Sequence, residues 1–341
     1  MATSASSVCI LSLALLLLLL LCSPSLAFLV PSSSPHLSYH HGPLLAGPQP
    51  INLYLAYYGK FRASDQATLR AFLSSLSGIK EDQHPQRRSM RTTPYNIIET
   101  PSVANWWAVT RHYADVDGRS VSQKLEVCGE TKDETYSLGR HLKAEDIARL
   151  AKTTAEAFSV AAAANSGNSV VLIFTAEDVY VEGFCMHSCG GHSEVHMESP
   201  NGGGSKVPYA WVGNSGEQCP GLCAWPFARP QYGPPMDPLK APNGRGVDGM
   251  VITLAKLLVS MATNPLGNAY YQGDNVSKNF GLEAGGACFG QFGTGSYPGY
   301  PGLLISNPTS GASYNVEGIG GAQFLVPWIW NPSTLSCAGQ A

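Results

Sequence analysis

The residues best suited to chemistry lie in segment 182–227, where cysteine, histidine, glycine and tryptophan are concentrated. Four cysteines in this segment form two C-x-x-x-C pairs, Cys185/Cys189 and Cys219/Cys223. Such pairs suit a structural zinc site, a redox-active dithiol or disulfide bonds, because each of these needs thiols close together. Redox enzymes usually carry C-x-x-C at a helix N-terminus, so the longer spacing favours zinc or disulfides over redox catalysis.

Three histidines in the same segment, His187, His192 and His196, are the candidate metal ligands there. Imidazole and carboxylate side chains form a ligand set that zinc accepts, and several glutamates lie nearby. However, Gly190 and Gly191 immediately precede His192 and indicate a loop, and the chain contains no H-E-x-x-H motif. Ordinary loop histidines are therefore the favoured interpretation, and we predict no metal site.

Nucleophilic catalysis has weaker support. Ser215 lies in Gly213-Asn214-Ser215-Gly216, which lacks the second glycine of G-x-S-x-G and is typical of a turn. Cys128 has no histidine with local evidence of pairing to it. We predict no catalytic residue and no cofactor, with zinc as the alternative.

The N-terminus predicts the compartment. A leucine-rich run over residues 10–22, too short to span a bilayer, precedes the small-residue site Ser25-Leu26-Ala27. We expect residues 1–27 to be a signal peptide cleaved after Ala27, with no later membrane anchor. The mature chain would then be secreted to the extracellular space, where disulfides persist.

Secretion decides between the cysteine alternatives. Cys9 and Cys22 leave with the signal peptide, and seven of the nine cysteines remain. Six of these are expected in disulfides whose pairing the sequence leaves open: Cys185, Cys189, Cys219, Cys223, Cys288 and Cys337. The seventh, Cys128, lies far from the others and is the expected free thiol.

Composition excludes some functions and limits the architecture. Only 13% of residues are charged and the net charge is −3, so no basic surface for nucleic acid is expected. After a Pro-, Ser- and His-rich lead-in at 28–50, no linker divides residues 51–341, which predicts a single domain. Asn275, in Asn275-Val276-Ser277, is the expected glycosylation site.

Strands and helices alternate through the first half of that domain. Strands are predicted at 51–58, 121–127 and 170–174, and helices at 65–77, 102–113 and 144–164. This order indicates an α/β fold with a central mixed sheet flanked by helices. After residue 181, long Gly- and Pro-rich loops held by disulfides are expected, interrupted by an amphipathic helix from Asp248 to Asn264-Pro265 and an edge strand at 324–330.

Several motifs together resemble the plant EXORDIUM, or phosphate-induced, family across the mature chain. They are His40-His41-Gly42-Pro43-Leu44-Leu45, Tyr58-Gly59-Lys60-Phe61, residues 178–185, residues 209–214, residues 219–227, Ala241-Pro242-Asn243-Gly244, Val247-Asp248-Gly249-Met250 and Tyr297-Pro298-Gly299-Tyr300. The resemblance implies a secreted apoplastic or cell-wall protein that regulates cell expansion in response to brassinosteroid, nutrient and carbon status, with no established catalytic activity.

A further resemblance concerns bacterial relatives that carry a metallohydrolase helix. Aligned at Asn264-Pro265, their metal-binding positions are Lys256, Leu257 and Ser260 in this chain, while a later acidic position is retained as Glu283. The resemblance implies a non-catalytic descendant of that scaffold.

Two alternatives stay open beside the non-catalytic hypothesis. A zinc-dependent hydrolase would draw its ligands from His187, His192, His196 and Glu283. A binder of cell-wall polysaccharide would present exposed aromatic side chains, and an extracellular protein is the other class of partner that the sequence allows.

Overall fold

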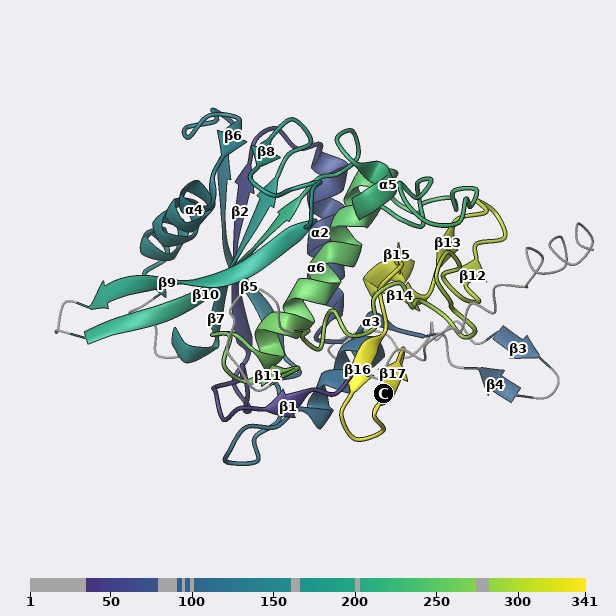
Figure 1. Ribbon diagram of the computed structural model, residues 1–341, viewed down its shortest axis with the longest axis horizontal. Helices are drawn as coiled ribbons and strands as arrows, with labels where there is room; N and C mark the ends of the chain where they lie inside the picture. The colour runs from purple at the N-terminus through teal and green to yellow at the C-terminus, as the bar shows by residue number, and fades with distance from the viewer. Residues whose placement is uncertain are drawn as a thin grey trace, which may run out of the picture. The chain divides into compact units, whose positions relative to one another are not determined.

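The computed structural model describes residues 35–78, 91–93, 96–98, 101–160, 166–199, 203–273 and 282–341 (Figure 1). The predicted signal peptide with its cleavage site after Ala27, and the predicted glycosylation site at Asn275, lie outside these residues.

The centre of the fold is a five-stranded mixed sheet with strand order β5-β2-β7-β10-β9. Its strands are β2 (Ile51–Tyr58), β5 (Leu125–Asp133), β7 (Ser169–Thr175), β9 (Gly190–Ser199) and β10 (Gly203–Gly213). The first four in spatial order run parallel, and β9 pairs antiparallel with β10 at one edge. The predicted α/β fold class with a mixed sheet is confirmed.

Helices cover both faces of the sheet, which is why its central strands are apolar along their whole length. Helices α2 (Ala63–Ser75) and α6 (Arg245–Thr263) lie on one face and α4 (Ala144–Ala157) on the other (Figure 1). Successive side chains of β2 point to opposite faces of the sheet. Leu53 and Leu55 therefore belong to the core with α2 and α6, and Tyr54 and Ala56 belong to the core with α4. Helix α6 is long and apolar enough to cross a membrane, but 89% of its apolar window is buried in the fold.

Shorter elements complete the described part of the chain. They are β1 (Ser38–Tyr39), β3 (Arg91–Thr93), β4 (Asn96–Ile98), α3 (Val103–Trp107), η1 (Ala108–His112), β6 (His141–Leu142), η3 (Ser166–Asn168), β8 (Tyr180–Val181), α5 (Pro220–Cys223), β11 (Tyr270–Tyr271), β12 (Ile305–Ser306), β13 (Ser313–Tyr314), β14 (Val316–Glu317), η4 (Ile319–Gly321), β15 (Gln323–Phe324), β16 (Ile329–Asn331) and β17 (Ser336–Ala338).

The largest difference from the sequence-based prediction is the hairpin of β9 and β10. Loops were expected after residue 181, yet Gly190 and Gly191 begin a ten-residue strand. Close packing explains the glycines: a Cβ on Gly190 would lie 2.4 Å from the carbonyl oxygen of Trp211 on β10. These glycines therefore permit strand pairing here, rather than marking a loop.

Several element boundaries also differ from the prediction. The strand expected at 121–127 begins at Leu125 and continues through polar residues to Asp133, because β5 is an edge strand. The helix expected at 102–113 is divided into α3 and a 3₁₀ helix. The helix expected to reach residue 164 ends at Ala157, and residues 161–165 lie outside the described part. The expected edge strand at 324–330 is two separate short strands, β15 and β16.

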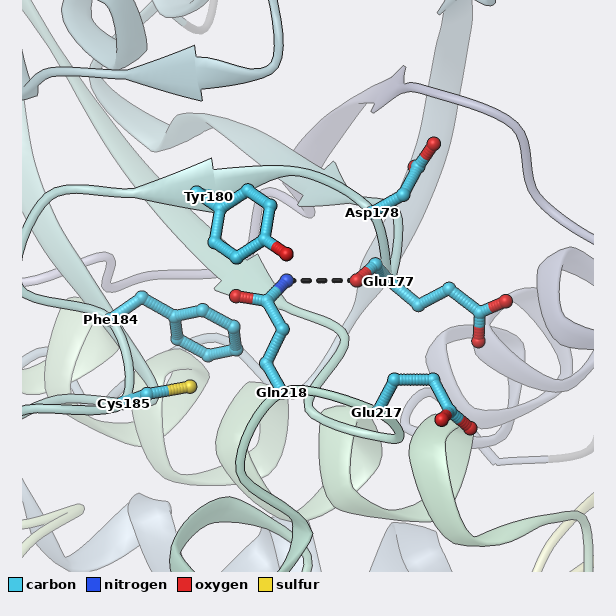
Figure 2. A pocket seen from close by; sticks show the side chains of 7 residues that line it. All are labelled: Glu177, Asp178, Tyr180, Phe184, Cys185, Glu217 and Gln218. Atoms are coloured by element: carbon cyan, nitrogen blue, oxygen red, sulfur yellow. Dashed lines mark hydrogen bonds between the residues drawn. The ribbon is translucent and has the colours of Figure 1, made fainter.

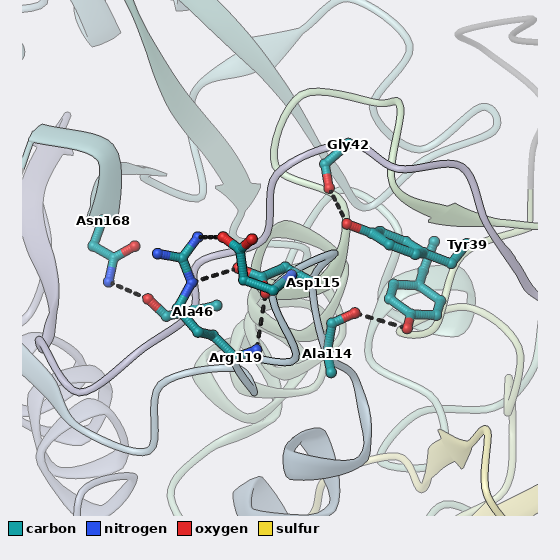
Figure 3. A network of polar contacts seen from close by, with 9 residues as sticks. Tyr39, Gly42, Ala46, Ala114, Asp115, Arg119 and Asn168 are labelled. Carbon is teal, nitrogen blue, oxygen red and sulfur yellow. Dashed lines mark hydrogen bonds and ion pairs between the residues drawn. The ribbon is translucent and has the colours of Figure 1, made fainter.

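The predicted lead-in packs onto the domain from residue 35. Strand β1 pairs with β11, and Leu37, Leu44 and Leu45 are buried in the core with α2 and α6. Polar contacts hold this segment, including a hydrogen bond from the Tyr39 hydroxyl to the Gly42 carbonyl (2.9 Å) and one from Asn168 to the Ala46 carbonyl (3.1 Å) (Figure 3). Packing of the domain thus begins earlier than residue 51.

Three disulfides lie in the C-terminal half, which confirms the expectation of disulfide bonds. They join Cys185 to Cys219, Cys189 to Cys223 and Cys288 to Cys337. The first two connect one C-x-x-x-C pair to the other, so each closes a loop with a sequence separation of 34. Cys128 is an exposed free thiol on β5.

Candidate functional site

Two predicted candidates, His192 and Glu283, meet near the C-terminal end of α6. His192 extends from β9, and its Nε2 lies 2.8 Å from Glu283 Oε2. The other carboxylate oxygen of Glu283 accepts a hydrogen bond from Asn264 Nδ2 at 2.7 Å, and Ser260 donates a further one. We call these four residues, with Lys256 at their edge, the His192–Glu283 cluster.

Local structure explains why Asn264 can serve this cluster. It is the C-cap residue of α6, and its side-chain oxygen accepts a hydrogen bond from the backbone N–H of Ala269 at 2.6 Å. The amide is thereby fixed with its nitrogen toward Glu283. Pro265 is the next residue and prevents the helix from continuing. The side-chain amide of Asn264 therefore lies at the end of α6.

Electrostatics keep the Glu283 carboxyl ionised. Burial alone would raise its pKa, but the bonds from His192, Ser260 and Asn264 outweigh burial and lower the pKa below its usual range. Burial lowers the pKa of Lys256, and the negative charge of Glu283 opposes that shift. The cluster therefore contains a carboxylate that hydrogen bonds from three neighbouring side chains hold in its ionised form.

This arrangement does not fit a zinc site. His187 and His196 are both exposed, and neither joins His192 and Glu283. Among the described residues, no three His, Cys, Asp or Glu side chains gather as metal ligands. Lys256 also brings a positive charge where a cation would have to bind. Of the four candidate ligands, the structure brings together only two.

A second site, which the sequence analysis missed, lies at the carboxyl ends of β7 and β10. It is an open cavity of about 560 Å³. Its lining residues are Glu177, Asp178, Tyr180, Phe184, Cys185, Glu217 and Gln218 (Figure 2). We call it the carboxyl-edge cavity, because ligands of open α/β sheets bind outside the carboxyl ends of the strands.

Gln218 holds the two walls of this cavity together. Its side-chain nitrogen donates a hydrogen bond to the carbonyl of Glu177 at 2.8 Å (Figure 2). The same nitrogen donates to the carbonyl of Val179 at 2.9 Å, also in the turn after β7. The neighbouring Cys219 forms the disulfide with Cys185. A hydrogen-bonded clamp and a covalent bond thus fix the loop after β10 against the segment that follows β7.

The N-terminal end of α6 lies beside the loop after β10. Arg245 donates a hydrogen bond to the carbonyl of Gly216 at 2.8 Å. Asp248, in the first turns of α6, is 1% exposed and accepts hydrogen bonds from the backbone N–H groups of Asn243 (2.8 Å) and Gly244 (3.0 Å). Burial raises the pKa of Asp248 to about 6, because these neutral donors only partly offset its removal from water.

The remaining candidates have other surroundings. Ser215 is fully buried, and its hydroxyl has no hydrogen-bond partner in the described part of the chain. The aromatic residues that a polysaccharide binder would have to expose are mostly packed: Tyr271 and Trp330 are buried, whereas Tyr297 is exposed. Burial, followed by the charge of Glu126, raises the pKa of the Cys128 thiol.

Comparison with known proteins identifies the family. The conserved region of phosphate-induced protein 1 matches residues 37–340. EXORDIUM-like 1 of Arabidopsis thaliana is 43% identical over 303 residues, 88% of each protein. PHOSPHATE-INDUCED 1 of Nicotiana tabacum is 41% identical over 89% of this chain and 87% of its own length. EXORDIUM of Arabidopsis thaliana is 40% identical over 92% of each protein.

No solved structure matches the chain. The match to the conserved region spans almost the whole described domain, and these relatives match this chain over most of their own length. The chain belongs to the EXORDIUM, or phosphate-induced protein 1, family.

Proposed function

We propose that the chain is a secreted protein of the extracellular space and cell wall that regulates cell expansion without catalysing a reaction itself. Family membership, the apolar segment before Ala27 and the three disulfides support this proposal. The proposal includes a response to brassinosteroid and to nutrient or carbon status, which the resemblance to the family implies.

The lowered pKa of Glu283 carries the non-catalytic part of the proposal. A general acid or base works best with a pKa near the working pH, and the hydrogen bonds to this carboxylate move its pKa away from that range. Glu283 is engaged by His192, Asn264 and Ser260. In the same cluster, Lys256 stands where the resemblance to bacterial relatives places a metal ligand.

Secretion is tested with two tagged forms of the chain expressed in plant cells, one complete and one lacking residues 2–27. We expect the complete form in the extracellular wash fluid, shortened at Ala27, and the truncated form inside the cells. Retention of the complete form inside the cells would overturn the extracellular assignment.

The role in expansion is tested by measuring cell length in seedlings that overproduce the protein. Glu283→Gln is the informative variant, because glutamine keeps a side-chain oxygen for Asn264 but lacks the charge that hydrolysis would need. We expect the variant to promote elongation as the unchanged protein does when both accumulate equally. Elemental analysis of the purified secreted protein should find zinc well below one atom per chain. Loss of elongation with stoichiometric zinc in the unchanged protein would favour a hydrolase.

A further inference from the structure

The carboxyl-edge cavity contains an aromatic surface on one side. Tyr180 is 51% exposed, and one face of its ring stacks on His141 with 4.9 Å between ring centroids. The ring of Phe184 lies beside it and is itself fixed by an edge contact with Trp211 (Figure 2). An exposed ring that is supported from behind presents one flat apolar face to a ligand.

The polar groups of the cavity are almost all hydrogen-bond acceptors. The carboxylates of Glu177 and Glu217 lie across from the aromatic rings, with Gln218 between the two sides (Figure 2). Because the nitrogen of Gln218 donates to two backbone carbonyls, its oxygen is left to accept from the cavity. A matching ligand must therefore donate hydrogen bonds, as hydroxyl groups or a cation would.

Charge balance favours hydroxyl groups over a cation. The Asp178 carboxylate is 3.2 Å from Arg140 and accepts a hydrogen bond from Tyr136 at 2.7 Å. Glu217 lies 3.9 Å from Arg245. Arg62, whose pKa is raised chiefly by its bond to Asp65, pairs with that aspartate at 3.0 Å rather than with Glu177.

Two of the three carboxylates of the cavity, Asp178 and Glu217, thus have an arginine neighbour, which cancels much of the negative charge that would attract a cation. A neutral ligand does not need that excess, since its hydroxyl groups use the carboxylates only as acceptors. The cavity volume of about 560 Å³ lies within the usual range for small-ligand sites.

The cavity is also held in shape before any ligand arrives. The Cys185–Cys219 disulfide and the Gln218 clamp connect its two walls. A rigid site loses less conformational entropy when it binds, so a small contact area can give measurable affinity.

We propose that the carboxyl-edge cavity binds a neutral carbohydrate, with a sugar ring on the exposed face of Tyr180 and its hydroxyl groups donating to Glu177, Glu217 and Gln218. The inference rests on the proposed function only in placing the protein where wall polysaccharides are available. It assigns the protein a ligand class and a site for it.

The test is calorimetric titration of the purified secreted protein with short neutral oligosaccharides of glucose, xylose and mannose. An oligogalacturonide and a Lys/Arg-rich peptide serve as acidic and basic comparisons. We expect saturable binding of at least one neutral oligosaccharide with a Kd of about 1 mM or below, and no binding of the basic peptide. Absence of binding by every neutral oligosaccharide, or binding of the basic peptide instead, would overturn the proposal.

Three variants locate the site. Tyr180→Ala removes the stacking face and should weaken binding roughly fivefold or more, whereas Tyr232→Ala, which removes another exposed tyrosine outside the cavity, should bind normally. Glu217→Gln replaces a charged acceptor by a neutral one, so it should weaken binding of a neutral oligosaccharide, but by less than Tyr180→Ala does. Equal affinity of Tyr180→Ala and the unchanged protein would contradict the proposal.

All three variants must match the unchanged protein in disulfide content and melting temperature before their affinities are compared. The titration is independent of the growth assay. A protein that is secreted and promotes elongation but binds no carbohydrate would overturn this inference and leave the proposed function standing.

Discussion

A buried carboxyl group, that of Asp248, lies near the N-terminal end of helix α6 and a partly buried one, that of Glu283, lies near its C-terminal end, and the two groups differ in what faces them. Near the N-terminal end, Asp248 accepts hydrogen bonds from the backbone N–H groups of Asn243 and Gly244 and from the Asn243 side chain. Near the C-terminal end, Glu283 accepts from His192, Asn264 and Ser260. The pKa of Asp248 is raised to about 6, while that of Glu283 is lowered.

The difference shows that counting hydrogen bonds does not predict whether a buried acid stays ionised. Asp248 has three neutral donors but is 1% exposed and also feels the negative charge of Asp65. Glu283 keeps a side chain that is 19% exposed, and its hydrogen bond from His192 is the largest of the effects that lower its pKa. Hydrogen bonds outweigh desolvation more easily for a carboxylate that keeps some contact with water.

The three disulfides also differ in how their loops overlap. Two disulfides with the same separation of 34 join the same two segments near the N-terminal end, whereas the Cys288–Cys337 bond, with a separation of 49, closes a loop that neither of them shares. Once Cys185–Cys219 has formed, Cys189–Cys223 closes only a short ring, so it removes little further entropy from the unfolded chain.

Replacing both cysteines of a bond by serine should therefore give unequal losses. We expect the unfolding free energy to fall by about 4 kcal/mol without Cys288–Cys337 and by about 2 kcal/mol without Cys189–Cys223. Guanidinium titration of each variant under non-reducing conditions measures both values. Equal losses would mean that the two bonds near the N-terminal end do not share one loop.

The second prediction concerns the acid near the N-terminal end. The carboxyl of Asp248 has a pKa of about 6 in the folded chain and an ordinary value of 3.8. Between these values the folded state holds a proton that the unfolded state has released, so this group makes the fold less stable as the pH rises.

Asp248→Asn removes that dependence. The stability of the unchanged protein relative to this variant should fall by on the order of 3 kcal/mol between pH 4 and pH 7. Denaturant titrations at several pH values measure the change, with Asp237→Asn, at an exposed aspartate, as the matched control. Parallel pH profiles for the unchanged protein and Asp248→Asn would contradict the raised pKa.

The sequence predicted the central strands and α6 closely, because β2, β7 and α6 have patterns that depend on local burial. Strand 51–58 was predicted with its exact bounds, and 170–174 within one residue at each end. The β9–β10 hairpin was missed because Gly190 and Gly191 were interpreted by their conformational freedom. What decides their role is the approach of the Trp211 backbone, a contact between strands that local spacing does not contain.

The sites were predictable only in part for a similar reason. His192 and Glu283 were both named as candidates, but they are 91 residues apart, and the sequence could not distinguish a pair from a set of metal ligands. The carboxyl-edge cavity was missed altogether, since its residues come from two loops that meet only when β7 and β10 lie side by side. Predicting the cavity would have required the order of strands in the sheet, because that order brings the ends of β7 and β10 together.

The third prediction tests the acid near the C-terminal end. His192→Ala leaves the Glu283 carboxylate partly buried with only amide and hydroxyl donors. We expect a loss of about 2 kcal/mol in unfolding free energy at pH 7. Because the pKa of Glu283 is lowered in the fold, its stabilising contribution is present above its ordinary value of 4.5 and is lost as the pH falls through the folded value.

The loss caused by His192→Ala should therefore shrink as the pH falls below 4.5, opposite in direction to the effect of Asp248. Exposed His196 on the same strand provides the control, because His196→Ala breaks no described hydrogen bond and should change stability by less than about 0.5 kcal/mol. A loss from His192→Ala that is constant from pH 3 to pH 7 would indicate lost packing rather than a lost partner for a charge.

The smallest effect is expected at Cys128, which belongs to neither end of α6. It lies exposed on edge strand β5 at a register shift, where Leu53 pairs with Val127 and Tyr54 pairs with Gly129. Its raised pKa keeps it a thiol at neutral pH, so it should react with iodoacetamide more slowly than free cysteine does. Cys128→Ser should change the unfolding free energy by less than about 0.5 kcal/mol and abolish labelling of the intact secreted protein. Labelling that persists in this variant would mean that one of the three disulfides is open. The stability differences between the two ends of α6 would then have to be measured on the fully oxidised protein.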